Sequence, residues 1–273
     1  MLADLHIHTT ASDGRLSPQE IVRQAEEAGL SHIAITDHDT VAAHLAIRAQ
    51  DVTGPRVPRL SIIPGIEFST DLPGHEVHIL GYFIDIDNSK LTDQLAIIAN
   101  DRLQRAKLMV DKLNKLGYSI DYDRVLAIAG QATSVGRPHI AKALLENNYF
   151  SSVADVFTQL LSSNGPAYVP HYKLTPEQVI RLITAAGGMA IVAHPGLIGD
   201  DGLVVDLIRA GLHGLEVYHP EHDQVMTSKY LAIAQKYNLK ITGGSDFHAI
   251  PGRYPDKLGI FTVSAKIVDS LSK

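Results

Sequence analysis

Short apolar segments of this chain end in histidine or carboxylate residues, and the spacing between the segments leaves room for helices. The first two segments, residues 2–6 and 32–36, run directly into such residues. Between them, Ser17 and Glu20 have the spacing of a capping box, and Pro18 suits a first helical turn. A strand, a helix and a second strand within about 35 residues predict a parallel βαβ unit.

The same alternation of strands and helices recurs along the chain, except in one long segment. Further strands are expected at residues 60–67, 76–82, 189–193, 214–218, 240–244 and 259–263. Alternating strands and helices predict an α/β fold with a sheet covered on both faces, and about seven or eight such units can close into a barrel. Residues 88–170 are instead mostly helical in pattern. We therefore predict a barrel made by residues 1–87 and 171–273, with residues 88–170 as an inserted helical subdomain that covers the active site.

The ionisable residues at the strand ends are candidate metal ligands. His6 and His8 flank one residue of a strand, so both side chains lie on the same face. Each fragment alone is more often structural than catalytic. Their joint occurrence at successive strand ends favours a metal site, because unpaired ionisable groups are costly to bury. The candidate ligands are His6, His8, Asp13, His38, Glu67, His78, His194, Asp246 and His248.

The size of this set indicates more than one metal ion. A catalytic zinc-like ion uses about three protein ligands and keeps one position open. Nine ligands, including a Glu67 carboxylate that can bridge, therefore suit two or three divalent ions. Imidazole and carboxylate ligands without sulfur suit Mn, Zn or Fe. A metal pair can activate water and stabilise the attacking and leaving oxygens of a phosphate. We also expect Asp37 to orient one of the ligand histidines.

Composition excludes several other classes of function. The chain has no cysteine, which rules out disulfides, thiolate metal sites and a cysteine nucleophile. Its formal net charge of -6 argues against binding duplex DNA along a wide face. No apolar stretch reaches the length of a membrane span, and the first residues lack the pattern of a secretion signal. We expect a cytoplasmic protein, and no pattern implies a protein partner or a membrane.

The ordered motifs resemble the PHP (polymerase and histidinol phosphatase) family of metal-dependent phosphoesterases. These motifs are His-x-His, Ser-Asp-Gly, Thr-Asp-His, the strand-end Glu, His-x-x-His, Ala-His-Pro-Gly and Gly-Ser-Asp-Phe-His, and the resemblance runs from Asp4 to about Val263. It implies a distorted (β/α)7 TIM-like barrel with a trinuclear metal centre. By position, His6, His8, Glu67 and Asp246 would hold one metal, Glu67, His78 and His194 a second, and Asp13, His38 and His248 a third. Some branches of the family have histidine where this chain has Asp13.

The segment from Ser134 to Ala141 is similar to the insert of the nucleotide phosphatase and 5'-3' exoribonuclease members of that family (the ribonuclease AM type). The resemblance implies that Ser134, Arg137 and His139 contact substrate phosphate. Arginine suits this role because its planar fork matches phosphate oxygens. Read without the resemblance, Arg137 is a surface charge at a helix start. Lys173 and His219 are further substrate-binding candidates. His194, His219 and Arg137 are the catalytic candidates.

Together these patterns predict an enzyme that hydrolyses phosphoesters with a metal-activated hydroxide. The expected substrate is a small phosphorylated nucleotide, either a nucleoside 3',5'-bisphosphate such as pAp or the 5' end of a short RNA. One alternative is a histidinol phosphatase or another small phosphomonoesterase. An amidohydrolase would usually carry a bridging lysine at a strand end, which we do not find. A metal-stabilised binding domain without catalysis should lack ligands, whereas this chain keeps all nine.

Overall fold

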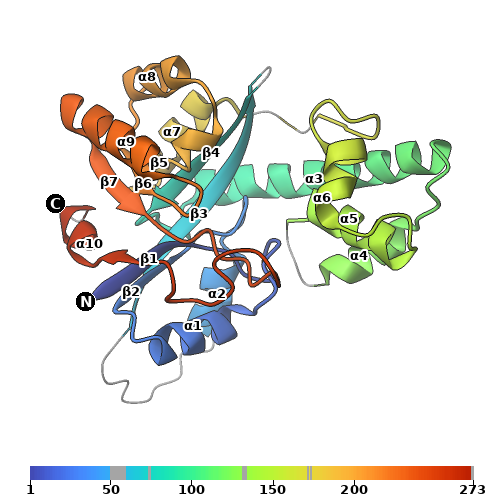
Figure 1. Ribbon diagram of the computed structural model, residues 1–273, viewed down its shortest axis with the longest axis horizontal. Coiled ribbons are helices and arrows are strands. Elements are labelled where there is room, and N and C mark those ends of the chain that lie inside the picture. The colour runs from blue at the N-terminus through green and yellow to red at the C-terminus, as the bar shows by residue number, and fades with distance from the viewer. Residues whose placement is uncertain (50–59, 73–74, 131–133, 171, 173, 272–273) are drawn as a thin grey trace.

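The computed structural model describes residues 1–49, 60–72, 75–130, 134–170, 172 and 174–271. Within these residues, eight strands form one sheet in the order β7-β6-β5-β4-β3-β2-β1-β8 (Figure 1). The strands are β1 (Leu2–Ile7), β2 (His32–Ile35), β3 (Ser61–Leu72), β4 (His75–Tyr82), β5 (Met189–Val192), β6 (Gly214–Tyr218), β7 (Lys240–Gly243) and β8 (Val263–Ser264). This mixed α/β architecture confirms the predicted fold class.

The sheet is nearly closed into a barrel by the segment that follows β7. Phe247 forms a parallel bridge with Ile7, and the His8 N–H donates to the Phe247 carbonyl at 2.9 Å. Gly244 permits this approach, because a Cβ at that position would lie 2.3 Å from the backbone nitrogen of His6. The end of β7 can therefore lie directly against β1, which brings the last part of the chain to the first.

The sheet departs from the expected parallel arrangement at β4 and β8. β4 pairs antiparallel with both β3 and β5, and Ser69 lies opposite His78. Only two residues separate β3 from β4, whereas a parallel pair needs a crossover of a dozen or more. The strand expected at residues 259–263 was placed too early: β8 is Val263–Ser264 and runs antiparallel to β1.

Helices follow most strands, as the sequence predicts. The capping box predicted at Ser17 and Glu20 forms, and the structure shows another at Thr175 and Gln178. The helices are α1 (Pro18–Glu27), α2 (Ala42–Ala49), α3 (Ser89–Lys115), α4 (Tyr122–Ala129), α5 (Arg137–Glu146), α6 (Val153–Val156), α7 (Pro176–Ala185), α8 (Asp201–Arg209), α9 (Gln224–Lys236) and α10 (Lys266–Leu271), with a π-helix at Phe157–Leu161 and a 3-10 turn at Pro195–Leu197. None of the helices in the described ranges is long and apolar enough to cross a membrane.

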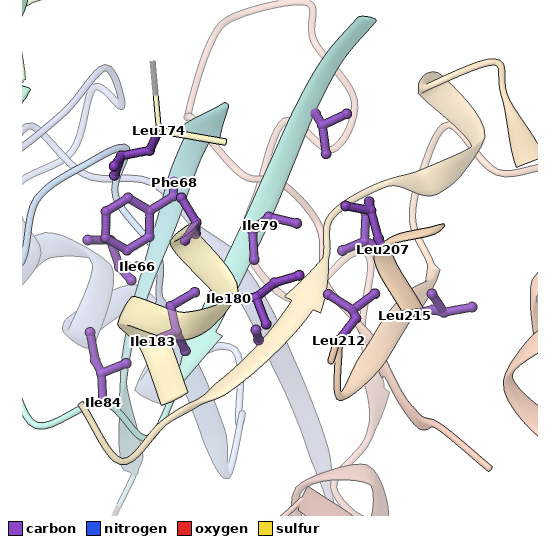
Figure 2. Close-up of a cluster of buried hydrophobic side chains, with 14 of the residues drawn as sticks. Ile66, Phe68, Ile79, Ile84, Leu174, Ile180, Ile183, Leu207, Leu212 and Leu215 are labelled. Atoms are coloured by element: carbon purple, nitrogen blue, oxygen red, sulfur yellow. The ribbon is translucent and has the colours of Figure 1, made fainter. Parts of the chain in front are cut away.

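The largest apolar core lies between the sheet and the helices that cover it. Phe68 and Ile79 from the β3–β4 hairpin lie near Ile180 and Ile183 of α7 in this core (Figure 2). All four side chains are buried. Because one face of β3 and β4 packs against α7 in this way, the position of the hairpin within the barrel is strongly specified.

A second apolar core lies among α3, α4, α5 and α6, in the group of helices at the right of Figure 1. The long helix α3 contributes to both cores. Leu91 and Leu95, near its start, pack in the barrel core, whereas Met109 and Leu113 pack in the second core. The predicted insert is thus helical. Its predicted start at residue 88 stays a prediction, because α3 runs through both parts of the molecule and its first half packs with the barrel.

Candidate metal centre

The nine predicted ligands meet at one end of the barrel. The ligand atoms of His6, His8, Glu67 and Asp246 lie within 4.8 Å of one another. The same holds for a group made by His8, Asp13, His38 and His248, and for a group made by His38, Glu67 and His78. His194 joins them through Glu67, with its Nε2 3.2 Å from Oε1. The expected convergence of distant segments is therefore present.

The topology explains how this convergence arises. His6 and His8 come from the end of β1, and Asp13 from the loop that follows it. His38, His194, Asp246 and His248 follow β2, β5 and β7. His78 lies near the start of β4, and because β4 is antiparallel, its beginning is at the same edge as the ends of its neighbours. The reversed strand direction thus places His78 in the cluster.

Glu67 lies at the centre of the cluster. Its Oε2 is 3.4 Å from His6 Nε2, 3.2 Å from His8 Nε2 and 3.2 Å from His38 Nδ1. Its Oε1 is 2.9 Å from His78 Nδ1 and 3.2 Å from His194 Nε2. Each oxygen faces a different set of imidazoles, which suits a carboxylate that bridges two cations.

The protonation of these groups depends on burial and on their neighbours. Burial favours a raised pKa for Glu67, but the charges of His38, His78 and His6 hold its pKa well below the ordinary value. Burial lowers the pKa of His38 to about 4, so this imidazole is neutral near pH 7. Burial also favours a lower pKa for His8, yet Asp246 and Glu67 outweigh it and raise the pKa to about 9. A cation that binds His8 must therefore displace a proton.

Hydrogen bonds turn several ring nitrogens toward the cluster. His6 Nδ1 lies 2.9 Å from Glu216 Oε1, so Nδ1 donates and Nε2 faces Glu67 and Asp246. His248 Nδ1 lies 2.8 Å from the backbone carbonyl oxygen of Asp246 and 3.2 Å from Arg253 Nη1. His6 Nε2 and His8 Nδ1 are buried and hydrogen-bond to no residue in the described ranges. Buried, unbonded imidazole nitrogens beside carboxylates form the donor set that a divalent cation requires, so the residues fit a metal.

Glu216 was missed by the sequence analysis. It is fully buried in β6, and its Oε2 accepts the His194 N–H at 2.8 Å while its Oε1 accepts from His6. Burial favours a raised pKa for Glu216, but His6 lowers its pKa by its charge and its hydrogen bond. A single carboxylate inside the apolar run 214–218 was the available signal, because an unpaired buried charge is costly.

Two ligand residues have an uncommon backbone conformation. His194 has φ of 29° and Asp246 has φ of 50°, in the left-handed region that few non-glycine residues adopt. The Glu216 carboxylate holds the His194 backbone N–H directly. Such strained positions persist only where the surroundings impose them, and they concentrate at functional sites.

Asp37 does not orient a ligand histidine, contrary to expectation. Its carboxylate accepts from the Thr9 N–H and the Thr9 hydroxyl, each at 2.7 Å, and from the Ser12 hydroxyl at 2.6 Å. These three donors belong to the loop that carries Asp13. Asp37 thus fixes the loop, because the polar groups there lie closer to it than any imidazole does.

A cavity of about 540 Å³, here called the main cavity, lies directly above the cluster. Asp13, His38, Glu67, His78, His194, Asp246 and His248 line its floor. Its walls carry the basic residues Arg15, Arg102, Arg105, Arg137, Lys142 and Arg253. Arg102 and Arg105 come from α3, and Arg137 and Lys142 from α5, so the helical insert forms much of the wall. The floor is made of metal-ligand types, and the wall is cationic.

The predicted substrate-binding residues occupy different places. Ser134 and Arg137 line the main cavity, and the Arg137 guanidinium lies 5.4 Å from the centre of the Phe157 ring. His139 is buried, its Nδ1 accepts the Gly136 N–H at 3.0 Å, and it lines a smaller neighbouring cavity. Lys173 lies outside the described residues. The contacts of these residues with a substrate stay predictions.

His219 lies behind the ligands. It is buried, its ring centre is 5.4 Å from that of His194, and its Nε2 is 3.9 Å from Asp246 Oδ2. Its Nδ1 accepts the Glu221 N–H at 3.1 Å, which leaves Nε2 as the protonated nitrogen. His219 is therefore placed beside Asp246, behind the lining of the main cavity, and is not itself one of the lining residues.

Arg102 and Arg253 also contact the site and were missed. Arg102 forms an ion pair with Asp39 and donates to the Ser69 hydroxyl at 3.1 Å. Arg253 forms an ion pair with Asp246. No local pattern distinguishes Arg102 from other charged residues of a helix, and Arg253 lies in a loop without a recognisable motif.

The barrel, the histidine–carboxylate cluster and the cationic cavity define the site of a metal-dependent hydrolase. Residues 4–167, more than half of the chain, match the PHP domain. This protein belongs to the PHP domain family.

Curated relatives agree with this assignment. The 5'-3' exoribonuclease Rnm of Escherichia coli (strain K12) is 36% identical over 91% of this chain and 85% of the relative. The phosphoribosyl 1,2-cyclic phosphate 1,2-diphosphodiesterase of Eggerthella lenta is 31% identical over 93% of this chain and 97% of the relative. The 3',5'-nucleoside bisphosphate phosphatase of Chromobacterium violaceum is 33% identical over 91% of this chain and 87% of the relative.

The fold has a close counterpart among solved structures. A Bifidobacterium adolescentis protein, named as a candidate metal-dependent phosphoesterase, has a TM-score of 0.86 at 32% identity, covering 98% of this chain and 94% of that one. The predicted class of enzyme, a metal-dependent phosphoric ester hydrolase, is confirmed, and both the family and the histidine–carboxylate cluster point to divalent metal cofactors.

Proposed function

We propose that this enzyme hydrolyses phosphomonoesters of small nucleotides. The substrate is a nucleoside 3',5'-bisphosphate such as pAp, or the phosphorylated 5' end of a short RNA. Relatives named for a nucleoside bisphosphate phosphatase and for 5'-3' exoribonucleases support this substrate class. The enzyme acts in the cytoplasm, needs no protein partner and does not act on duplex DNA.

One observation carries the proposal: the main cavity joins a carboxylate–imidazole floor to a wall of guanidinium groups. Without cations, Asp13, Glu67 and Asp246 would repel a phosphate. With divalent ions bound, the floor would carry positive charge and would attract the reacting phosphate. Guanidinium groups pair well with the oxygens of a phosphate, so the wall suits the remaining charged groups of a nucleotide.

Two or three divalent ions, Mn, Zn or Fe, fit the ligand set. His6, His8, Glu67 and Asp246 would hold the first, Glu67, His78 and His194 would hold the second, and Asp13, His38 and His248 would hold the third. The contacts of Glu67 support its bridging role, since each of its oxygens faces a separate set of imidazoles. Bound ions supply water activation and neutralise charge on the phosphate oxygens.

The side chains of the protein orient the ligands and the substrate. Glu216 accepts the Nδ1 proton of His6, which keeps the Nε2 lone pair directed at the cluster. Arg137 and Ser134 grip the substrate from the wall, and His139 supports them from α5. His194 serves as a ligand. His219 holds a proton at Nε2 beside Asp246 and does not line the main cavity, so it contributes to catalysis by orienting the Asp246 carboxylate.

A phosphate-release assay tests this proposal. Purified enzyme is assayed with pAp, a 5'-phosphorylated trinucleotide and histidinol phosphate, with and without added Mn²⁺, and its metal content is measured. We expect pAp to exceed histidinol phosphate by at least about tenfold in kcat/KM, a difference of about 1.4 kcal/mol in transition-state stabilisation. A chelator should abolish the activity and Mn²⁺ should restore it. Turnover of histidinol phosphate alone would contradict the nucleotide assignment.

A second candidate function is hydrolysis of a cyclic phosphodiester. The Eggerthella lenta relative that carries this name is matched over 97% of its length, so nearly all of its sequence has a counterpart in this chain. The same assay decides between the two, with phosphoribosyl 1,2-cyclic phosphate as a fourth substrate. A preference for the cyclic diester over pAp would favour this second function.

A further inference from the structure

A second cavity of about 440 Å³, here called the side cavity, adjoins the main cavity. Ser12, Arg15 and Lys142 line both cavities. The remaining wall of the side cavity comes from the loop that carries Asp13, from α4 and from α5. A single extended ligand can therefore occupy both spaces while it passes between Arg15 and Lys142.

Arg15 and Lys142 differ from two other cations of the main cavity. Arg102 is paired with Asp39, and Arg253 is paired with Asp246. Within the described parts of the chain, neither Arg15 nor Lys142 has a carboxylate within ion-pair distance. The charge of Asp13 acts on Lys142, but the ion-pair contacts of Asp13 are with His248 at 3.2 Å and His8 at 3.7 Å.

The surroundings of these two cations favour an anion between them. Lys142 is half-buried, and burial together with the charge of Arg15 lowers its pKa. The charge of Asp13 acts on Lys142 in the opposite direction, but Asp13 already pairs with His248 and His8, so the repulsion between the two cations remains and a bound phosphate would relieve it. Arg15 and Lys142 line both cavities, so a phosphate bound between them would belong to a ligand that extends from one cavity into the other.

The side cavity has the shape and lining for one further nucleotide. Its volume lies in the range of small-ligand sites, roughly 300–1,000 Å³. Ile128, Ala129 and the ring of His139 form an apolar part of its wall, against which a base can pack. Thr10 offers a hydroxyl group to a sugar or a phosphate, and the Ser12 hydroxyl, which donates to Asp37, can accept from a sugar hydroxyl. Flat stacking surfaces next to cations are the usual means of holding a single-stranded nucleic acid.

We propose that the side cavity binds the next nucleotide of a single-stranded oligonucleotide whose reacting end lies in the main cavity. The phosphate between the two nucleotides lies between Arg15 and Lys142. This inference rests on the proposed function and narrows it: the enzyme prefers an oligonucleotide to a mononucleotide, and Arg15 and Lys142 determine that preference.

The test compares pAp with a 5'-phosphorylated trinucleotide as substrates. The variants are Lys142→Met, which keeps the length and removes the charge, and Lys142→Arg, which keeps the charge. Lys107→Met, at an exposed position of α3 that lines neither cavity, is the control. We expect Lys142→Met to lower kcat/KM for the trinucleotide about tenfold more than for pAp, which is the effect of one charged contact. Lys142→Arg should restore most of the difference.

Salt dependence gives a second measurement. Loss of one phosphate contact to a single strand should reduce the slope of log(kcat/KM) against log salt by about 0.7 for the trinucleotide. Thermal unfolding of each variant shows whether it folds. Equal losses on both substrates in a folded Lys142→Met variant would overturn this inference and leave the proposed function standing. Failure of the wild-type enzyme to hydrolyse either substrate would overturn both.

Discussion

The floor and the wall of the main cavity are built in different ways. The floor consists of buried side chains on strand ends, each held by neighbours, such as His6 by Glu216. The wall consists of long cationic side chains, several of them on the helical insert, such as Arg137 and Lys142. The floor is arranged in advance for cations, whereas the wall is arranged for an anion.

This difference separates chemistry from selection. Metal ligands need positions accurate to a few tenths of an ångström, and a closed barrel with hydrogen-bonded ligands provides that accuracy. Substrate selection tolerates longer, more exposed side chains on an added element. Substitutions in the floor should therefore change metal content and rate together, and substitutions in the wall should change substrate affinity while leaving the metals in place.

The largest effect is expected for Glu67→Gln. Loss of the charge on the central carboxylate should remove at least one metal ion and lower kcat/KM by more than about a hundredfold, beyond the loss typical of a residue that only orients a ligand. Metal analysis and pAp hydrolysis measure this. A variant with full metal content and near wild-type rate would refute the bridging role and the distinction between floor and wall.

Glu216→Gln should have the next largest effect. The amide retains the size but loses the charge, so it can no longer accept strongly from both His6 Nδ1 and the His194 N–H. We expect a loss of about 10- to 100-fold in metal affinity or activity, measured by titration of metal-free protein. The control is Glu20→Gln, an exposed residue of α1, which should change neither quantity. An unchanged metal affinity for Glu216→Gln would limit Glu216 to a structural role.

Arg137→Ala tests whether the wall of the main cavity affects substrate affinity without affecting the metals. We expect KM for pAp to rise about tenfold, because a charged contact to phosphate is lost, with metal content unchanged. Steady-state kinetics and metal analysis measure both quantities. Arg124→Ala, an exposed residue of α4 paired with Glu146, is the control and should leave KM as it is. If Arg137→Ala lost metal, the floor and the wall would not be independent.

The smallest effect is expected in the pH dependence of stability due to His44. This buried residue of α2 places Nε2 2.9 Å from the Ile35 carbonyl, and burial lowers its pKa. A histidine with a lowered folded-state pKa contributes its full stability above the unfolded value of about 6.5 and loses it as pH falls through the lowered value.

Urea unfolding of metal-free protein between about pH 7.5 and 5 measures this effect. The stability of the wild type should fall more steeply with decreasing pH than that of His44→Gln, whose amide does not titrate. Parallel pH profiles for the two proteins would show that His44 is not a source of acid sensitivity.

Much of the floor could be predicted because its signals are local. Period-2 spacing places His6 and His8 on one face, and a histidine directly after an apolar run, such as His194, indicates a strand end. The capping boxes at Ser17 and Thr175 depend on contacts within one turn, and both form. Local rules of this kind need no knowledge of the rest of the chain.

The wall and the support of the ligands could not be predicted in the same way. Glu216 contacts His6 across 210 positions of sequence, and Arg102 contacts Asp39 across 63. The direction of β4 follows from a hairpin that the strand pattern alone left open. These features depend on which distant segments become neighbours.

The sequence by itself determined the order of most strands and helices, the set of candidate metal ligands and the class of chemistry, since each follows from residue type and short spacing. Only the tertiary structure decided which groups orient the ligands and that two cavities meet at Arg15 and Lys142. Side chains become partners in that way only when the sheet closes and the insert packs over it, which depends on the summed contacts of the whole chain.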